Sequence, residues 1–248
     1  RYRIKQALLV SFNSNLTMTE PRDLFYTPQM SIPEFIEIEK LLFGRNFYRS
    51  LETNANKPKL SPAVETFISL RDRKITQEEA DARIQLYGNS DIRRDIQSYY
   101  LQPGFNQQYA LSISGGGEHS AQNFSIGYDK IQSDIIGNSG ARWTIATGSQ
   151  WNFLKDRVKA GVQINFSNQN NVTTTSLPFG YAFDRMVDED GNPLTIANTY
   201  STRYIESIQG KGLLDWTYTP LKEIGQMDYR TEAYDLRVSP AMQLQVTT

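Results

Sequence analysis

The sequence of 248 residues contains no cysteine and only one histidine. Without cysteine the chain has no disulfides, no thiolate metal ligands and no cysteine nucleophile. It also lacks any apolar run of about 18 residues, which excludes a transmembrane helix. The formal net charge of −1 offers no general attraction to nucleic acid, so we expect no nucleic-acid partner. The fold is therefore predicted from the pattern of apolar side chains.

Residues suited to catalysis or metal binding are equally scarce. His119, the single histidine, lies in an expected tight turn, which favours a solvated turn residue over a ligand or a base. Asp188, Asp190 and Asn192 have the first spacings of a calcium loop, but Pro193 occupies the glycine position and the distal glutamate is missing. We therefore expect no catalytic residue, no metal ligand, no cofactor and no enzyme activity.

The clearest pattern covers residues 142–167, where apolar and polar side chains alternate in two strands. With Lys155 and Asp156 as the turn, Phe153 falls opposite Val158, and the later pairs keep the apolar faces together. Because side chains alternate with a period of two, a slip of one residue would scramble the faces, so this agreement supports the register. The polar face of the second strand is Gly, Gln, Asn and Ser, with Lys159 as its single charge.

This hairpin has the pattern of an outer-membrane barrel, apolar towards lipid and polar towards a wet lumen. Trp143 and the pair Trp151 and Phe153 stand roughly 26–33 Å apart at ~3.3 Å per residue, and strand tilt shortens this towards a ~25 Å apolar band. The mean hydropathy of −0.52 is compatible with a barrel, because only every second strand residue meets lipid. The alternative is a half-buried antiparallel sheet in a soluble protein.

Further strands are expected at residues 7–18, in a hairpin at 107–129 and at 234–246, where Pro240 predicts an edge or a bulge. With the turn of the 107–129 hairpin centred on Glu118 and His119, Tyr109 is expected to pair with Tyr128. We divide the chain into a first barrel strand (1–19), a mostly helical extracellular-type insertion (20–106) and further barrel strands with a long loop at about 168–231 (107–248). The hairpin turns are tight, whereas the other connections are medium or long. This asymmetry is typical of outer-membrane barrels. The predicted fold is mainly β: antiparallel up-and-down strands forming part of a large outer-membrane β-barrel.

Capping signals predict the helices of the insertion. The expected starts follow Ser31, Ser61, Thr76 and either Ser90 or Asp91. Gly44 and Gly88 are expected to end the first and third of these helices, and a further short helix is expected near residues 199–208. The apolar stripe of the first helix is predicted to be Phe35, Ile38, Leu41 and Leu42.

The linear pattern resembles the SusC/RagA family of TonB-dependent outer-membrane transporters over nearly the whole chain. The matching segments, whose order and spacing carry the resemblance, are PQMSIPEFIEIEKLLFGRNFY, KLSPAVETF, ITQEEADARI, NQQYALSISGGGEHSAQNFSIGYDK, ANTYSTRYIESIQGKGLLDWTYTPLKEI and YDLRVSPAMQLQV. The resemblance implies the first strands of a large barrel, placed in the cell outer membrane and in contact with its lipid. It also implies import of oligosaccharides or peptides, with extracellular loops that contact a SusD-like surface lipoprotein.

The chain departs from the family pattern in lacking an amino-terminal plug, a TonB-contacting motif and the carboxy-terminal strands. About six strands do not close the roughly 22-stranded barrel of plugged transporters. Arg1 opens directly into strand-like sequence without an initiator methionine, so we expect a piece of a longer protein. In the family, TonB acts through the plug region that is missing here.

Aromatic residues in the long loops are the candidate ligand or partner contacts, namely Phe25, Tyr26, Phe179, Tyr181, Phe183, Trp216 and Tyr218. They are suited to stacking on sugar rings or contacting a partner protein, and local packing is the alternative for each. The alternative function is a soluble carbohydrate-binding β module with a helical insertion. A hydrolase is disfavoured because no nucleophile or metal constellation is found.

Overall fold

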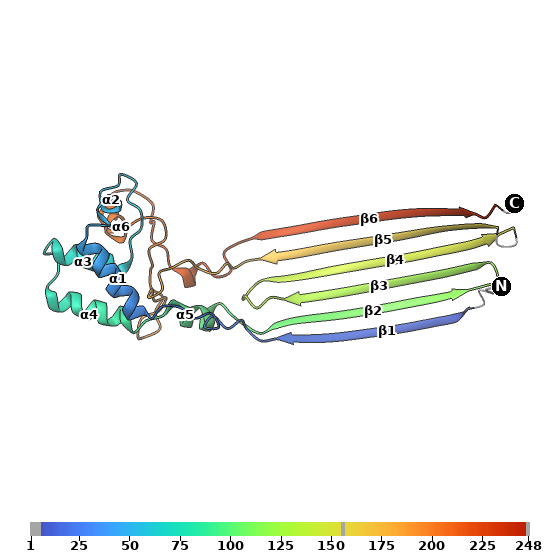
Figure 1. Cartoon of the computed structure of the whole chain (residues 1–248), viewed down its shortest axis with the longest axis horizontal. Helices are drawn as coiled ribbons and strands as arrows, with labels where there is room; N and C mark the ends of the chain where they lie inside the picture. The colour runs from blue at the N-terminus through green and yellow to red at the C-terminus, as the bar shows by residue number, and fades with distance from the viewer. Residues whose placement is uncertain (1–5, 155–156, 247–248) are drawn as a thin grey trace. The chain divides into compact units, whose positions relative to one another are not determined.

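The computed structural model describes residues 6–154 and 157–246 (Figure 1). The fold is mainly β, with one six-stranded antiparallel sheet whose strand order follows the chain. Its strands are β1 (Gln6–Thr19), β2 (Gly104–Gly116), β3 (Ser120–Gln132), β4 (Ser139–Phe153), β5 (Val158–Thr173) and β6 (Tyr229–Leu244). The expected up-and-down arrangement of strands is therefore confirmed.

The strands are long, with 13 to 16 residues each. Typical strands in globular proteins have about five or six residues, whereas a strand that crosses a bilayer needs about 9–11. The sheet is not closed, since β1 and β6 each pair on one side only among the described residues. Pro240 lies in the edge strand β6 opposite Val162 without a shift of register, so the edge position is the correct alternative.

The predicted hairpin registers are confirmed. Phe153 pairs with Val158, and the same register continues along β4 and β5. Tyr109 pairs with Tyr128 in the preceding hairpin, whose turn falls at residues 117–119. The predicted turn residues Lys155 and Asp156 lie outside the described residues.

The remaining elements are helical. They are α1 (Ile32–Gly44), α2 (Arg49–Glu52), α3 (Pro62–Arg71), α4 (Gln77–Gly88), α5 (Ile92–Tyr99), α6 (Thr202–Ile208) and the 3-10 helix η1 (Pro220–Lys222). The predicted caps are present: Ser61 and Thr76 accept hydrogen bonds from the third residue of their helices, and Asp91 caps α5. Among the described residues, none of the helices has the length and apolar character needed to cross a membrane.

Two segments that are distant in sequence, residues 22–101 and 176–226, form one compact unit, here called the helical unit. Phe183 packs in one core cluster with Ile36 and Ala63, and Met186 packs in another with Ile92 and Tyr100. Main-chain contacts support this packing, because the Ile92 N–H donates to Ala182 O at 3.0 Å. Each of these two clusters therefore combines side chains from both long connections of the sheet.

One expectation about α1 is wrong in part. Ile36 and Glu39 are its buried residues, whereas Ile38 and Leu41 are exposed. Of the four residues predicted to form the apolar stripe, two are partly buried: Phe35, which packs against the core, and Leu42. The buried face of α1 is rotated because Glu39 finds a polar partner inside, the Ser61 hydroxyl at the start of α3.

Ion pairs connect the two segments of the helical unit. Arg203 in α6 donates through Nε to Glu65 Oε2 in α3, and its Nη1 lies 3.9 Å from Glu52 Oε1 in α2. Arg71 binds the same Glu52 carboxylate with its two terminal nitrogens, at 2.9 and 2.5 Å. Burial raises the pKa of Glu65, and the nearby Arg203 charge opposes this shift, so Arg203 favours the ionised form of this buried carboxylate.

We predict that Arg203→Met destabilises the helical unit by about 2–3 kcal/mol, because it leaves the Glu65 carboxylate buried without its cation. The measurement is chemical unfolding followed by circular dichroism at 222 nm. Lys40→Met is the control, because Lys40 and Glu37 are both exposed and their charged atoms are 4.0 Å apart. We expect this variant to change the free energy of unfolding by less than about 0.5 kcal/mol. Equal losses of unfolding free energy in Arg203→Met and Lys40→Met would contradict the assignment of Arg203 as the stabilising partner of buried Glu65.

Candidate functional site

One face of the sheet carries large apolar side chains across all six strands. The register aligns one continuous apolar row, which consists of Phe12, Leu111, Ile126, Ile145, Phe166 and Leu236. The next row is almost as apolar and consists of Val10, Ile113, Phe124, Thr147, Ile164 and Val238. Alternation along each strand places these residues together on what we call the apolar face.

This apolar face is not part of a buried core in the described chain. Phe12 is 68% exposed, and Leu236 at the other edge is 65% exposed. Every buried hydrophobic residue among the described residues belongs to the helical unit, and none belongs to the sheet. Water-exposed monomers rarely keep so continuous an apolar surface, so the face requires a covering of lipid or protein.

Aromatic residues mark one boundary of the apolar face. The register aligns a row that contains Tyr109, Tyr128, Trp143 and Tyr234. The rings of Tyr128 and Trp143 lie 4.5 Å apart. One row further on, towards the long connections, the same face carries Lys130 and Glu232. Amphipathic rings between apolar and charged side chains are the arrangement found where a protein surface passes from lipid to water.

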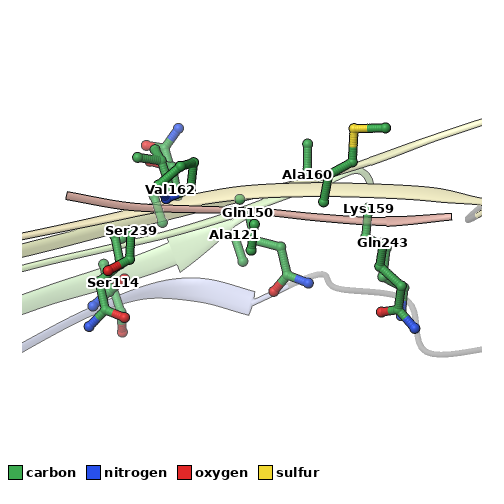
Figure 2. Close-up of a pocket in the computed structure, with 17 residues that line it drawn as sticks. Ser114, Ala121, Gln150, Lys159, Ala160, Val162, Ser239 and Gln243 are labelled. Atoms are coloured by element: carbon green, nitrogen blue, oxygen red, sulfur yellow. The ribbon is translucent and has the colours of Figure 1, made fainter.

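The opposite, hydrophilic face is built mostly from small and polar residues, with a few charged ones. One of its rows consists of Ser11, Ser112, Ser125, Ala146 and Asn165, ending at Arg237. Towards the short turns the face forms a hollow of about 690 Å³ that includes Asn123, Lys159 and Gln163. Figure 2 shows Ser114, Ser239 and Gln243 pointing to one side there, and Ala160 and Val162 to the other. The two faces thus differ in chemistry along the same strands.

The candidate loop aromatics all lie in the helical unit, but their exposure differs. Tyr26, Phe179 and Trp216 are exposed by 85%, 83% and 50%, so their rings are free to meet a ligand or partner. Trp216 also packs on Tyr200, with ring centroids 5.0 Å apart. The ring of Phe25 lies 4.3 Å from the Arg93 guanidinium and is partly occupied by this contact.

The other candidates are held by local packing. Phe183 is fully buried in the core, so local packing, the alternative given for each of these aromatic residues, holds for Phe183. Tyr181 stacks on Phe183, its hydroxyl donates to Lys59 O at 3.5 Å, and burial raises its pKa to about 12. Tyr218 is half-buried and accepts the Ile196 N–H through its main-chain oxygen at 2.9 Å. Among the described residues, no ring contact joins any two of the other five candidates, which are Phe25, Tyr26, Phe179, Trp216 and Tyr218.

Besides Glu65, two further buried carboxylates lie in the helical unit. Glu39 accepts the Ser61 hydroxyl at 2.8 Å, and burial raises its pKa to about 7. Asp184 accepts the Tyr181 N–H at 2.6 Å, and burial raises its pKa to about 6. Nowhere in residues 6–154 and 157–246 do three or more potential metal ligands cluster. The contacts of both carboxylates are with capping and turn groups, which gives them a structural role.

We predict that the helical unit loses stability as pH rises from about 5 to 8. A folded-state pKa above the ordinary value means that the folded protein binds the proton more tightly, so this contribution is complete at low pH and disappears as pH rises through about 7 for Glu39. Glu39→Gln should flatten the profile by on the order of 2–3 kcal/mol. Thermal unfolding at 222 nm across this range is the measurement. Glu37→Gln, at an exposed position of the same helix, should leave the slope unchanged.

The comparisons with known proteins give no identification of this chain. No protein-family model matches it, and no curated protein sequence matches it either.

Proposed function

We propose that this chain is part of a SusC/RagA-type TonB-dependent transporter of the outer membrane. The proposal depends on one observation: an apolar row runs without interruption across six strands, on a face that no core covers in the part of the chain that the structure describes. Lipid is the covering that fits this face, because the row is bounded by aromatic residues and then by charged ones. The sheet is then one wall of a large barrel.

Two further features support this proposal. The strands exceed the length needed to cross a bilayer. The connections after β1, β3 and β5 leave one end of the sheet and include both long segments, whereas those after β2 and β4 are short. Outer-membrane barrels have this asymmetry, with long extracellular loops and short periplasmic turns.

In this function each part has a role that matches its chemistry. The hydrophilic face lines the import route for oligosaccharides or peptides. The helical unit is extracellular, and its exposed rings Tyr26, Phe179 and Trp216 contact a SusD-like lipoprotein or the arriving ligand. The energy comes through TonB acting on a plug outside this chain. The chain itself carries out no catalysis in this proposal and holds no cofactor.

Cell fractionation of the full-length protein tests the membrane assignment. We expect the protein in the outer-membrane fraction, with detergent needed for release. A monomer that stays in solution without detergent and binds glycans would instead support a soluble carbohydrate-binding module and contradict the proposal.

Arginine substitutions at neighbouring positions of β5 test which face meets lipid. Ile164→Arg on the apolar face should cost about 2–4 kcal/mol, because a charge near the middle of the bilayer loses its hydration. Gln163→Arg, one residue away in the hydrophilic hollow, should cost less than about 1 kcal/mol. Urea unfolding of the full-length protein in lipid vesicles is the measurement. A larger cost at Gln163 than at Ile164 would reverse the assignment of the faces.

A further inference from the structure

One lysine of the apolar face lies just beyond the aromatic row. Lys130 of β3 is exposed, and the register places Gln107 of β2 and Ala141 of β4 directly beside it. Tyr128, two residues earlier in β3, and its partner Trp143 in β4 belong to the aromatic row. Residues two apart in a strand point to the same side of the sheet, so the Lys130 side chain emerges next to these two rings.

Lys130 has no anionic partner among the described residues. Asp129, the preceding residue, lies on the hydrophilic face, where its carboxylate accepts from Arg142. The acidic residue in the row of Lys130 is Glu232, which lies three strands away in β6, or about 14 Å at the usual spacing of strands. The Glu232 carboxylate accepts the Tyr234 hydroxyl at 2.5 Å. Within the described chain, the Lys130 ammonium is therefore left to a group from outside.

The side chains around Lys130 suit an anion. In the next row towards the long connections, β3 supplies Gln132 and β4 supplies Ser139, and both are exposed. Amide and hydroxyl groups of this kind donate hydrogen bonds to anionic oxygens. None of the side chains that β2, β3 and β4 place on the apolar face is acidic. An anion beside Lys130 thus meets neutral donors and no neighbouring carboxylate that would repel it.

The surface on the other side of the aromatic row is apolar. The row after Tyr128 and Trp143 supplies Ile126 of β3 and Ile145 of β4. An occupant that fits both sides has an anionic group joined to apolar chains, so that the anion meets Lys130 and the chains cover the isoleucines. A phosphorylated lipid has this construction, whereas a soluble anion or an acidic protein loop offers no apolar chains for the surface below.

We propose that Lys130 and the polar side chains around it form a site for the phosphate group of lipopolysaccharide in the outer leaflet. The inference rests on the proposed function, which places the long connections, and with them this end of the sheet, on the extracellular side. The aliphatic stem of Lys130 lies along the aromatic rings while its ammonium reaches the phosphate. The amides of Gln107 and Gln132 donate to the same group, and the acyl chains follow the apolar face. Basic side chains at a bilayer boundary bind lipid headgroups through this combination of charge and hydrogen bonds.

Removing the lysine charge tests the site. The full-length protein, purified in detergent and stripped of bound lipid, is titrated with bisphosphorylated lipid A and with dephosphorylated lipid A, and native mass spectrometry measures the bound fraction. We expect the phosphorylated form to bind more tightly. Lys130→Gln should weaken its binding about fivefold, because one lysine near a membrane surface contributes on this order to the binding of anionic lipid. Lys130→Arg should stay within about twofold of the unchanged protein, since it keeps the charge.

Lys159→Gln is the matched control. Lys159 belongs to the same sheet but lies in the hollow of the hydrophilic face. Its replacement removes the same charge and should leave the affinity for phosphorylated lipid A within about twofold. Equal thermal unfolding of the two glutamine variants ensures that binding, and not folding, is compared.

Phosphatidylglycerol distinguishes the two sources of lipid phosphate. Its phosphodiester carries a single negative charge, whereas a phosphate monoester of lipid A carries close to two. We therefore expect phosphatidylglycerol to bind more weakly and to depend less on Lys130. Equal affinity and equal dependence on Lys130 for the two lipids would overturn the assignment to lipopolysaccharide.

Three results would overturn the site itself: no weakening by Lys130→Gln, equal weakening by Lys159→Gln, or equal binding of dephosphorylated lipid A. A protein that requires detergent, but whose binding of lipid A ignores Lys130→Gln, contradicts the site and leaves the transporter in place. A protein that is soluble without detergent contradicts the transporter regardless of the titration.

Discussion

The structure depends on one constraint, the hydrogen-bonded register that keeps six long strands in step. Because side chains alternate with a period of two, this register decides which side chains share a face. It aligns Phe12 at one edge with Leu236 at the other through four apolar neighbours. A slip of one residue in any strand would move its apolar side chains among the serines and asparagines of the hydrophilic face. The chemistry of both faces therefore follows from strand pairing.

The helical unit is stabilised by different means. Its buried hydrophobic residues come from both long connections, and each of its buried carboxylates has a polar partner: Glu39 has Ser61, Asp184 has the Tyr181 N–H, and Glu65 has Arg203. Buried carboxylates persist only where such partners offset their loss of hydration. Along the chain, segments of the sheet alternate with the two segments of the helical unit. The helical unit contains the buried hydrophobic residues, and the described part of the sheet contains none.

Local signals were sufficient to predict much of this fold. The hairpin registers followed from alternation, and the helix starts followed from side chains such as Ser61 and Thr76 that bond the nearby main chain. The sequence did not predict which face of α1 is buried, because Glu39 is inside only through Ser61, which is 22 residues away. The burial of Phe183 was missed for the same reason, since its partners Ile36 and Ala63 lie in the other connection. The continuous apolar row required the combined register of all six strands, which single hairpins do not reveal.

The shared core of the helical unit has a consequence for the order of folding. Tyr100 and Pro220 are 120 residues apart, yet the Tyr100 hydroxyl donates to the Pro220 carbonyl at 2.7 Å. During synthesis, helices α1 to α5 are made well before residues 176–226. Their apolar side chains therefore remain exposed until β2 to β5 and then residues 176–226 have been synthesised. Contacts between residues so far apart in sequence form slowly, because the long loop between them has to close first. The nascent chain is therefore expected to need a chaperone through this interval, and a truncation after β5 should leave the helices without the second half of their core.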